Sequence, residues 1–250
     1  MEYRPRLTST ENELIKHFRN KNGVGIIGDT HEPYCIAEYR DFCYEVFDRF
    51  GVSEILHIGD ECDNAALSYH EQSPSMLNAE SEAEKAQKAM EGWYKTFPEV
   101  KVCVGNHSAL PFRQATTAGI PNRFLKSYEE IWNAPKGWRW EMQWEIDGVL
   151  YEHGTGSSGQ NGARSRAMAN RQSTVIGHSH SFGGVSYMAS RNYIIFGLNV
   201  GCVIDVNHMA FAYGKHFPKK PTIGCGVVLD EGKTAIFIPM NLGSKIVRVK

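Results

Sequence analysis

Val24-Gly25-Ile26-Ile27-Gly28-Asp29-Thr30-His31 is a short apolar run that ends on a glycine and continues into a carboxylate and an imidazole. An apolar run of this length is typical of a buried strand. Asp29 and His31 lie two residues apart, so on an extended segment their side chains point to the same side. The stretch therefore predicts a buried strand that delivers two metal-binding groups at its carboxyl end.

Four later strand-like runs, at 54–58, 100–104, 149–152 and 175–176, end in the same way. Three of the groups that follow them begin with a glycine: Gly59-Asp60-Glu61-Cys62-Asp63, Gly105-Asn106-His107 and Gly177-His178-Ser179-His180, while His153 stands alone. Ligands of open α/β sheets bind beyond the carboxyl ends of the strands. We therefore expect one rim of seven metal ligands: Asp29, His31, Asp60, Asn106, His153, His178 and His180.

The order of predicted elements indicates an α/β fold. The first half alternates strands with helices expected over 9–20, 37–50, 78–97 and 123–132, which favours a parallel sheet. The second half is mostly strands, expected over 138–146, 149–152, 175–176, 185–188, 193–198, 226–229, 235–238 and 246–249, with one helix near 162–171. We expect these strands to form a second, mixed sheet that packs face to face with the first, with helices outside. Residues 1–250 would form one domain, of which 1–20 are an N-terminal helical extension.

The predicted ligand set suits two divalent ions. Carboxylate and imidazole bind first-row metals, so Mn²⁺ is the first choice and Fe, Zn or Ni are alternatives. Two ions about 3.5–4 Å apart can lower the pKa of a shared water and hold both the attacking and leaving oxygens of a phosphoryl group. Such a pair needs a bridging carboxylate, for which Asp60 is the natural candidate. This chemistry indicates phosphoester hydrolysis.

At these residues the chain resembles the calcineurin-like metallophosphoesterase superfamily, whose pattern is Asp-x-His, Gly-Asp-x-x-Asp, Gly-Asn-His-Asp/Glu, His and Gly-His-x-His. The resemblance runs from residue 28 to residue 180 and fills every ligand position. It implies a four-layer αββα sandwich with a dinuclear metal site at the carboxyl ends of the strands. One ion would be held by Asp29, His31, Asp60 and His180, and the other by Asp60, Asn106, His153 and His178.

The resemblance also implies catalytic roles for two further residues. A metal-bridging hydroxide would attack phosphorus in line. His107 would protonate the leaving oxygen or stabilise the transition state, and Asp63 would orient and charge His107. The chain is thus expected to be a hydrolase, a metal-dependent phosphoric ester hydrolase.

Two departures from the family pattern bear on the substrate. Ser108 follows His107 where the family usually has an acid, so the charge on His107 depends more on Asp63. Asn64 stands where the protein Ser/Thr phosphatases of the superfamily carry an arginine that grips phosphate. Asparagine cannot make that charged bidentate contact. We therefore favour a phosphodiester or nucleotide substrate, a class that includes nucleic acid, with a small-molecule phosphomonoester as the first alternative.

A glycine- and serine-rich run, 154–162, follows His153 and leads into a helix that carries Arg164 and Arg166. Backbone amides, a helix N-terminus and arginines can cradle a phosphate. The same residues fit a flexible loop and a solvated helix face equally well. Asn64, Arg164 and Arg166 are the candidate substrate contacts, whereas Trp138, Trp140 and Trp144 are expected to pack in the core or on a sheet rather than to stack on bases.

Composition narrows the remaining classes. The chain has 250 residues, of which 22% are charged, and a formal net charge of −1, which gives no global reason to bind nucleic acid or an anionic membrane. No apolar stretch approaches the roughly 18 residues of a transmembrane helix, and the first residues lack the apolar core of a secretory signal. The six cysteines show no short pair spacing, so we expect reduced, mostly buried thiols. These features predict a cytoplasmic protein that does not bind a membrane. They do not indicate its oligomeric state.

The remaining histidines and one alternative functional class complete the predictions. His57 is expected to pack structurally, and His17, His70, His208 and His216 receive no role in the site. A different functional class, a non-catalytic binding module of the same fold, is disfavoured because an interaction scaffold needs neither a full ligand set nor His107.

Overall fold

A six-stranded mixed sheet carries most of the predicted ligands. The structure, a computed structural model, describes residues 9–10, 13, 23–69, 77–204 and 220–240. In this sheet the order is β11-β10-β1-β2-β3-β4, with β1 to β4 parallel and β10 antiparallel to both β1 and β11. The strands are β1 (Val24–Ile27), β2 (Glu54–His57), β3 (Val100–Cys103), β4 (Trp138–Glu141), β10 (Gly224–Leu229) and β11 (Thr234–Pro239).

A five-stranded mixed sheet faces the first. Its order is β5-β6-β7-β9-β8, in which β6, β7 and β9 are parallel and the two edge strands run antiparallel to their neighbours. The strands are β5 (Gln143–Ile146), β6 (Val149–Glu152), β7 (Ser173–Ile176), β8 (Gly183–Ala189) and β9 (Ile194–Val200). The prediction of two facing sheets, the second of them mixed, is confirmed.

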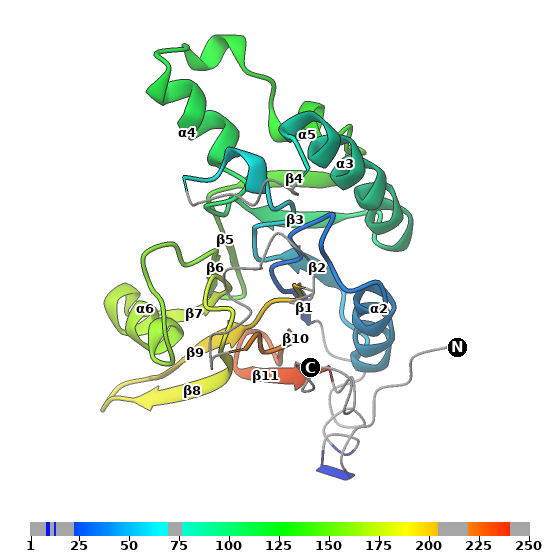
Figure 1. The fold of residues 1–250 in the computed structure, drawn as a ribbon. Helices are drawn as coiled ribbons and strands as arrows, with labels where there is room; N and C mark the ends of the chain where they lie inside the picture. The colour runs from blue at the N-terminus through cyan, green and yellow to red at the C-terminus, as the bar shows by residue number, and fades with distance from the viewer. Residues whose placement is uncertain (1–8, 11–12, 14–22, 70–76, 205–219, 241–250) are drawn as a thin grey trace.

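Helices cover the outer face of each sheet, as Figure 1 shows for α2 and α3 on one side and α6 on the other. The helices are α2 (Tyr39–Phe50), α3 (Ala79–Thr96), α4 (Leu110–Thr117), α5 (Tyr128–Ile131) and α6 (Gly162–Asn170), with 3-10 turns η1 (Ala65–Leu67) and η2 (Asn122–Phe124). Capping residues mark the ends of two of these helices. Asn78 caps α3 by accepting the Ser81 N–H at 2.9 Å, and Gly51 ends α2 in the left-handed region, with φ of 61°.

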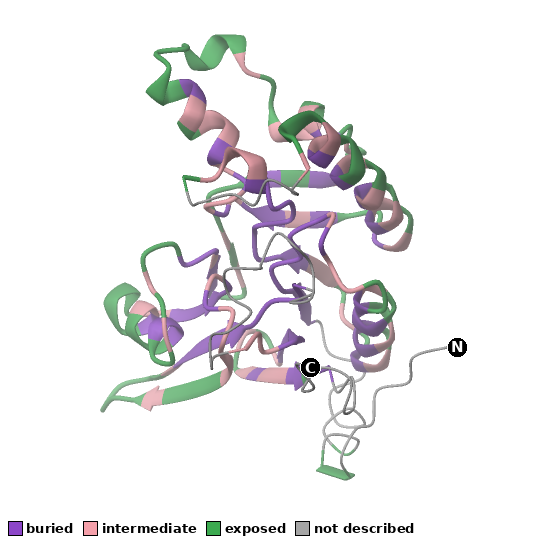
Figure 2. Ribbon diagram, viewed as in Figure 1, coloured by how far each residue is buried: buried purple, intermediate pink, exposed green. Residues whose placement is uncertain are grey.

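Two hydrophobic cores separate these layers, and buried residues accordingly line the strands and the inner sides of the helices in Figure 2. The core between the sheets joins side chains such as Ile26 and Leu56 to Tyr151 and Leu198. A second core packs the aromatic side chains of α2 and α3 on the first sheet. Each fully buried apolar side chain contributes roughly 1.5–3 kcal/mol. The cores thus clamp the strands whose ends carry the site.

The strand predicted over 138–146 is wrong as a single element. It divides at Met142, which is 70% exposed, so that β4 belongs to the first sheet and β5 to the second. Even-numbered side chains face inward on both sides of the break, towards the helices at Trp138 and towards the inter-sheet core at Trp144. Because apolar and polar residues alternate in the sequence from Trp138 to Ile146, periodicity could not reveal the break. Trp138 and Trp140 are buried and Trp144 is half-buried against the inter-sheet core, as expected of packing residues.

Other predictions need smaller corrections. The helix expected over 123–132 is a 3-10 turn followed by the short helix α5, and α4 arises where no element was expected. β10 and β11 join the first sheet rather than the second, which makes the first sheet mixed instead of wholly parallel. The helix predicted over 9–20, most of the extension 1–20, and the strand over 246–249 lie outside the described residues.

The structure also shows the state of the cysteines and the character of the helices. All six cysteines are free thiols, and five of them are buried. In the part of the chain that the structure describes, none of the helices combines the length and apolar character that crossing a membrane requires.

Candidate metal centre

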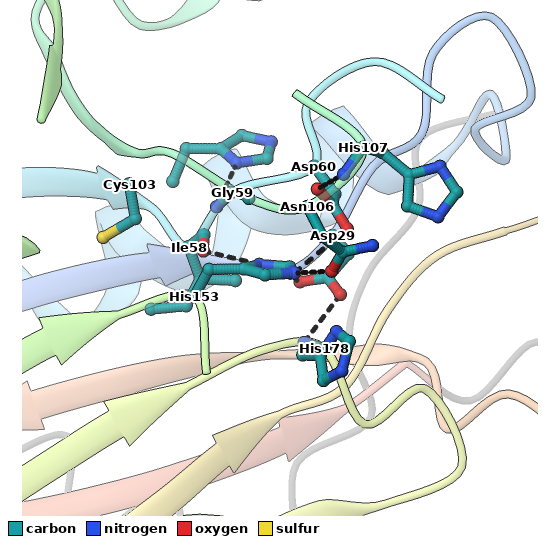
Figure 3. Close-up of polar contacts among 12 residues, drawn as sticks. Asp29, Ile58, Gly59, Asp60, Cys103, Asn106, His107, His153 and His178 are labelled. Carbon is teal, nitrogen blue, oxygen red and sulfur yellow. Dashed lines mark hydrogen bonds and ion pairs between the residues drawn. The ribbon is translucent and has the colours of Figure 1, made fainter. Parts of the chain in front are cut away.

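The seven predicted ligands come together where the two sheets meet at the carboxyl ends of five strands. Asp29, Asp60 and Asn106 follow β1, β2 and β3 of the first sheet, while His153 and His178 follow β6 and β7 of the second. Figure 3 shows these side chains converging across the gap between the sheets. The site is therefore a product of the face-to-face packing and of neither sheet alone.

Four of the nine described non-glycine residues with positive φ lie at this rim. His31, Asp60, Asn64 and His178 all adopt positive φ, at 49°, 52°, 49° and 60°. A non-glycine residue in this region costs of order 1–3 kcal/mol and persists where its surroundings hold it. One such restraint is the hydrogen bond from the His31 N–H to the Asp60 carbonyl, at 2.9 Å. This strain aims the side chains at a common point.

Two glycines make room for the two metal-competent carboxylates. A Cβ on Gly105 would lie 2.0 Å from Asp60 Oδ1, and a Cβ on Gly177 would lie 2.0 Å from Asp29 Oδ1. No real side chain tolerates such distances, so both carboxylates occupy space that only glycine leaves open.

The first ligand group consists of Asp29, His31 and His180. The Nε2 atoms of the two histidines face each other at 3.2 Å, and His180 Nε2 lies 3.2 Å from Asp29 Oδ2. One donor atom from each residue can be chosen so that all three lie within 4.8 Å of one another. His180 is 31% exposed, whereas Asp29 and His31 are fully buried. The group therefore opens to solvent on the His180 side.

The second ligand group surrounds His153. Its Nε2 lies 3.0 Å from both Asp60 Oδ2 and Asn106 Oδ1, while its Nδ1 lies 3.1 Å from the Ile58 carbonyl, which fixes the ring. His178 takes part differently: its N–H donates to Asp29 Oδ2 at 2.8 Å, and its ring meets that of His153 edge to face, with centroids 5.2 Å apart.

The spacing of these atoms fits divalent metals. Two donors about 2.1 Å from one ion and at right angles to each other lie about 3.0 Å apart. The observed distances between donor atoms, 3.0–3.2 Å, match this value in both groups. Asp29 Oδ1 and Asp60 Oδ2 are also buried without a hydrogen bond from any described residue; Asp60 Oδ2 faces His153 Nε2 at ion-pair distance but outside hydrogen-bond geometry. Buried carboxylate oxygens of this kind are costly unless a cation balances them.

Charge within the site shifts the pKa values of its acids and bases. Burial opposes ionisation of Asp29 and Asp60, but the neighbouring His153 and other histidines hold both pKa values below the ordinary range. Burial also opposes charge on His153, yet Asp60 and Asp29 raise its pKa to about 9. For His31 and His178, burial dominates and lowers the pKa. A neutral imidazole is the form that binds metal.

Asp63 contacts both histidines that flank it. Its Oδ1 lies 2.6 Å from His31 Nδ1 and 3.1 Å from His107 Nδ1, and its backbone carbonyl lies 2.6 Å from His107 Nδ1. Burial lowers the pKa of His107, but the Asp63 hydrogen bond and the charges of Asp60 and Asp63 prevail and raise it to about 10. Hydrogen bonds from both histidines keep the pKa of Asp63 low despite its burial. Asp63 is thus shared between a candidate ligand and the candidate acid.

Glu61 and Ser108 form a buried contact beside the site that sequence reasoning did not find. The Ser108 hydroxyl donates to Glu61 Oε2 at 2.6 Å, and the Trp140 indole N–H donates to Glu61 Oε1 at 3.2 Å. Burial raises the pKa of Glu61 to about 7, against the lowering effect of the Ser108 hydrogen bond. The only signal in the sequence was an acid at a spacer position, together with a serine after His107 where an acid is usual.

The three candidate substrate contacts, Asn64, Arg164 and Arg166, differ in their burial and in their hydrogen-bond partners. Asn64 is buried, and its amide donates to the His107 carbonyl at 3.0 Å, which ties two loops together. Arg166 lies 3.4 Å from a Glu152 carboxylate oxygen and donates to the Thr155 carbonyl at 2.9 Å. Arg164 is exposed on α6. A role for any of them in substrate binding stays a prediction.

His57 is a packing residue, as predicted. It is buried, its ring contacts Thr30 Oγ1 at 3.0 Å, and it accepts the Gly59 N–H at 3.2 Å. Burial lowers the pKa of His57 to about 3, so the ring stays neutral. The other four histidines without a predicted role, His17, His70, His208 and His216, lie outside the described residues.

Comparison with known proteins yields structural likeness only. No protein-family model matches the chain, and no curated protein matches its sequence. Among solved structures, the chain is similar to Vacuolar Protein Sorting 29 from Cryptosporidium parvum, at 13% identity and a TM-score of 0.47, covering 90% of this chain and 93% of that one. It is also similar to a single mutant of Vps29 from Entamoeba histolytica, at 13% identity and a TM-score of 0.39, covering 88% and 99%. Identity this low carries no residue's role from those proteins to this chain.

Proposed function

We propose that the chain is a divalent-metal-dependent phosphoester hydrolase with two ions in the site described above. The observation that carries the proposal is the spacing of donor atoms in both ligand groups, 3.0–3.2 Å around buried carboxylate oxygens that lack hydrogen bonds. The first ion would take Asp29, His31, Asp60 and His180. The second would take Asp60, Asn106, His153 and His178.

Bound ions would activate water and neutralise charge on the phosphoryl group. Mn²⁺ is our first choice for both positions, with Fe, Zn and Ni as alternatives, because carboxylate and imidazole ligands suit all four. Asp60 is suited to bridge the ions. Its Oδ1 accepts the N–H of His107 at 2.7 Å, which fixes the carboxylate and turns Oδ2 towards His153.

Substrate would approach from the side where His107 and His180 are 25% and 31% exposed. Asn106 and His178 are also partly exposed, whereas the remaining proposed ligands, Asp29, His31, Asp60 and His153, are buried. A raised pKa keeps His107 protonated near neutral pH, so it can donate a hydrogen bond to a phosphoryl or leaving oxygen. Asp63 holds that ring through Nδ1 and leaves Nε2 to face the substrate. His107 is thus our candidate acid and Asp63 its positioning partner.

We favour a phosphodiester or nucleotide as substrate over a phosphoprotein. The Asn64 amide donates a hydrogen bond to the His107 carbonyl, and an asparagine cannot make a charged bidentate contact with a phosphate dianion. A diester carries one negative charge on its phosphate where a monoester carries up to two, so it demands less cationic binding. A small-molecule phosphomonoester is the alternative.

The test compares hydrolysis of bis-p-nitrophenyl phosphate and p-nitrophenyl phosphate by the Mn²⁺-loaded protein, with metal content measured on the same sample. Faster turnover of the diester is the expected result. Asp60→Asn should abolish hydrolysis and reduce metal content, because it removes the bridging charge. Asp48→Asn, the same change at an exposed position on α2, serves as the matched control. Two bound ions with hydrolysis of neither ester would refute the proposal and favour a binding module.

The role of His107 has its own test. His107→Ala should lower kcat by about 10²–10⁴-fold, the usual contribution of a general acid, while both ions stay bound. Loss of an ion in this variant, measured by elemental analysis, would show that His107 is a ligand and that the assignment is wrong.

A further inference from the structure

Glu61 is a fully buried acid in a position that has no assigned role. It lies between Asp60 and Asp63 in the loop after β2, and its side chain contacts Ser108 and Trp140. Burying a carboxylate costs several kcal/mol unless hydrogen bonds compensate. Here both oxygens accept a hydrogen bond, at 2.6 and 3.2 Å. The loop thus retains a costly group that an apolar residue could have replaced.

Ser108 transmits the position of Glu61 to two loops. A serine hydroxyl has one donor and two acceptor sites. Because Ser108 donates to Glu61, its oxygen is left to accept the N–H groups of Asp60 and Gly105, at 3.2 and 3.3 Å. All three hydrogen-bonding sites of the hydroxyl are then occupied. Glu61 decides which way the hydroxyl proton points.

The same two loops are joined again through Asp60. Its Oδ1 accepts the N–H groups of His107 and Ser108, at 2.7 and 3.3 Å. The loop that carries Asp60 and the loop that carries Asn106 and His107 are therefore held in register by four contacts of Asp60, Glu61 and Ser108, in addition to those of His107 with Asp63 and Asn64. Ser108 takes part in three of the four.

The outer end of the chain of contacts is rigid. Trp140, on β4, is 7% exposed, and Tyr128 stacks on it with centroids 6.3 Å apart and an interplanar angle of 15°. Glu61 consequently links the two site loops to the aromatic packing beneath β4. Motion of either loop would have to break a buried hydrogen bond.

We propose that Glu61 is a positioning residue which, through the Ser108 hydroxyl, sets the distance between Asp60 and the Asn106–His107 loop and so aligns His107 with the phosphoester. Ser108 carries no acid of its own, and the carboxylate beside the loop comes instead from position 61. This inference rests on the proposed function. A residue that acts in this way changes turnover more than metal loading or substrate affinity.

Three variants test the proposal. Glu61→Gln keeps the shape of the side chain but can accept from only one of its two donors, and Ser108→Ala removes the hydroxyl. The double variant Glu61→Gln/Ser108→Asp returns a carboxylate to the point where the amides of Asp60 and Gly105 converge. Glu32→Gln is the matched control: Glu32 is also a buried acid that accepts a tryptophan N–H, from Trp93 at 2.8 Å, and its side chain has no contact with Ser108 among the described residues.

The first measurement is kcat and KM with a nitrophenyl and a phenyl ester of whichever class the wild type hydrolyses. Both single variants should keep two ions and lose kcat by about 10- to 100-fold, with little change in KM. The loss should be larger for the phenyl ester, because the poorer leaving group depends more on protonation by His107. The double variant should recover most of the lost kcat. Any change in kcat caused by Glu32→Gln should be the same for both esters.

The second measurement needs no metal and no activity. Amide hydrogen exchange of the metal-free protein, followed by NMR, should show the N–H groups of His107 and Ser108 exchanging about tenfold faster in both single variants, the loss of roughly one hydrogen bond. The N–H of Phe97, which is bonded to the Trp93 carbonyl in α3, is the internal control.

The outcomes separate the two proposals. A wild type that hydrolyses neither ester class refutes the proposed function, while exchange still reports on the loops. An active wild type whose Glu61→Gln variant keeps both its kcat ratio between the esters and its amide protection overturns the positioning role alone. An equal loss with both esters, accompanied by loss of metal, also overturns it, because Glu61 would then only stabilise the fold.

Discussion

Replacing Gly105 by alanine is expected to displace the Asp60 carboxylate and empty the proposed bimetallic site. The new Cβ would lie 2.0 Å from Asp60 Oδ1, 2.6 Å from Asp60 N and 2.7 Å from Asp60 Cγ. Asp60 cannot turn aside freely, because its Oδ1 is held by two backbone N–H groups of the facing loop. The two loops must separate, or the carboxylate must rotate away from His153.

The magnitude follows from the overlap. Contacts to a Cβ closer than about 3.0 Å are essentially never found, so the carboxylate must move by about 1 Å. Forcing an extra methyl group into a packed site costs typically 1–3 kcal/mol, or about 2–10 °C in Tm for a chain of this size. A misplacement of about 1 Å at a reacting centre can cost on the order of 10²-fold in rate.

The assay measures Mn²⁺ affinity by titration and Tm by calorimetry. Gly92→Ala is the control, since its Cβ would lie 1.9 Å from Arg40 Nη1, a similar overlap with the mobile end of a side chain. That variant should keep wild-type metal binding and gain stability, because alanine is favoured over glycine within a helix by about 1 kcal/mol. If Gly105→Ala binds two ions with wild-type affinity, the close approach of Gly105 to Asp60 is not a requirement of the site.

Two further predictions concern the fold. The pKa values of His107 and His153, raised to about 10 and about 9 from the ordinary 6.5, give stability that is complete below about pH 6.5 and lost as the pH rises through 9–10. The unfolding free energy in EDTA should therefore fall over that range, and a flat profile would contradict the assigned charges. Leu56→Ala should cost about 2–5 kcal/mol, because Leu56 is fully buried between the sheets. Urea denaturation measures this cost, and a loss below about 1 kcal/mol would show that the inter-sheet core collapses around the gap.

Much of the fold was accessible from local patterns. The sequence pattern predicted α2, α3 and α6, and the apolar runs predicted β1, β2 and β3 to within one residue at each end. The break at Met142 was not accessible, because apolar and polar residues alternate in the sequence through it, even though the Met142 side chain is exposed. Helix α4 was not accessible either, because Pro111 stands near its start and a proline is also common in loops.

The candidate site divides in the same way. A metal-binding group at each strand end, in most cases after a glycine, is a property of the chain, and parallel strands end at the same edge of a sheet, so the seven residues could be proposed as a set. The Ser108–Glu61 contact, separated by 47 residues, and the sharing of Asp63 between His31 and His107 could not be proposed. Whether such a hydrogen bond forms depends on differences of a few tenths of an ångström in atom positions, which no sequence pattern encodes.

The sequence by itself determined which chemical groups this protein can offer and at which strand ends they stand, because side-chain chemistry and strand periodicity are local. The tertiary structure decided which groups meet. Asp29 and His180 are 151 residues apart and lie in contact only because β1 and β7 belong to sheets whose carboxyl ends face each other. It likewise decided that Glu61 supports the loop of His107, since only packing of β4 and Trp140 beneath that loop makes a buried carboxylate tolerable there.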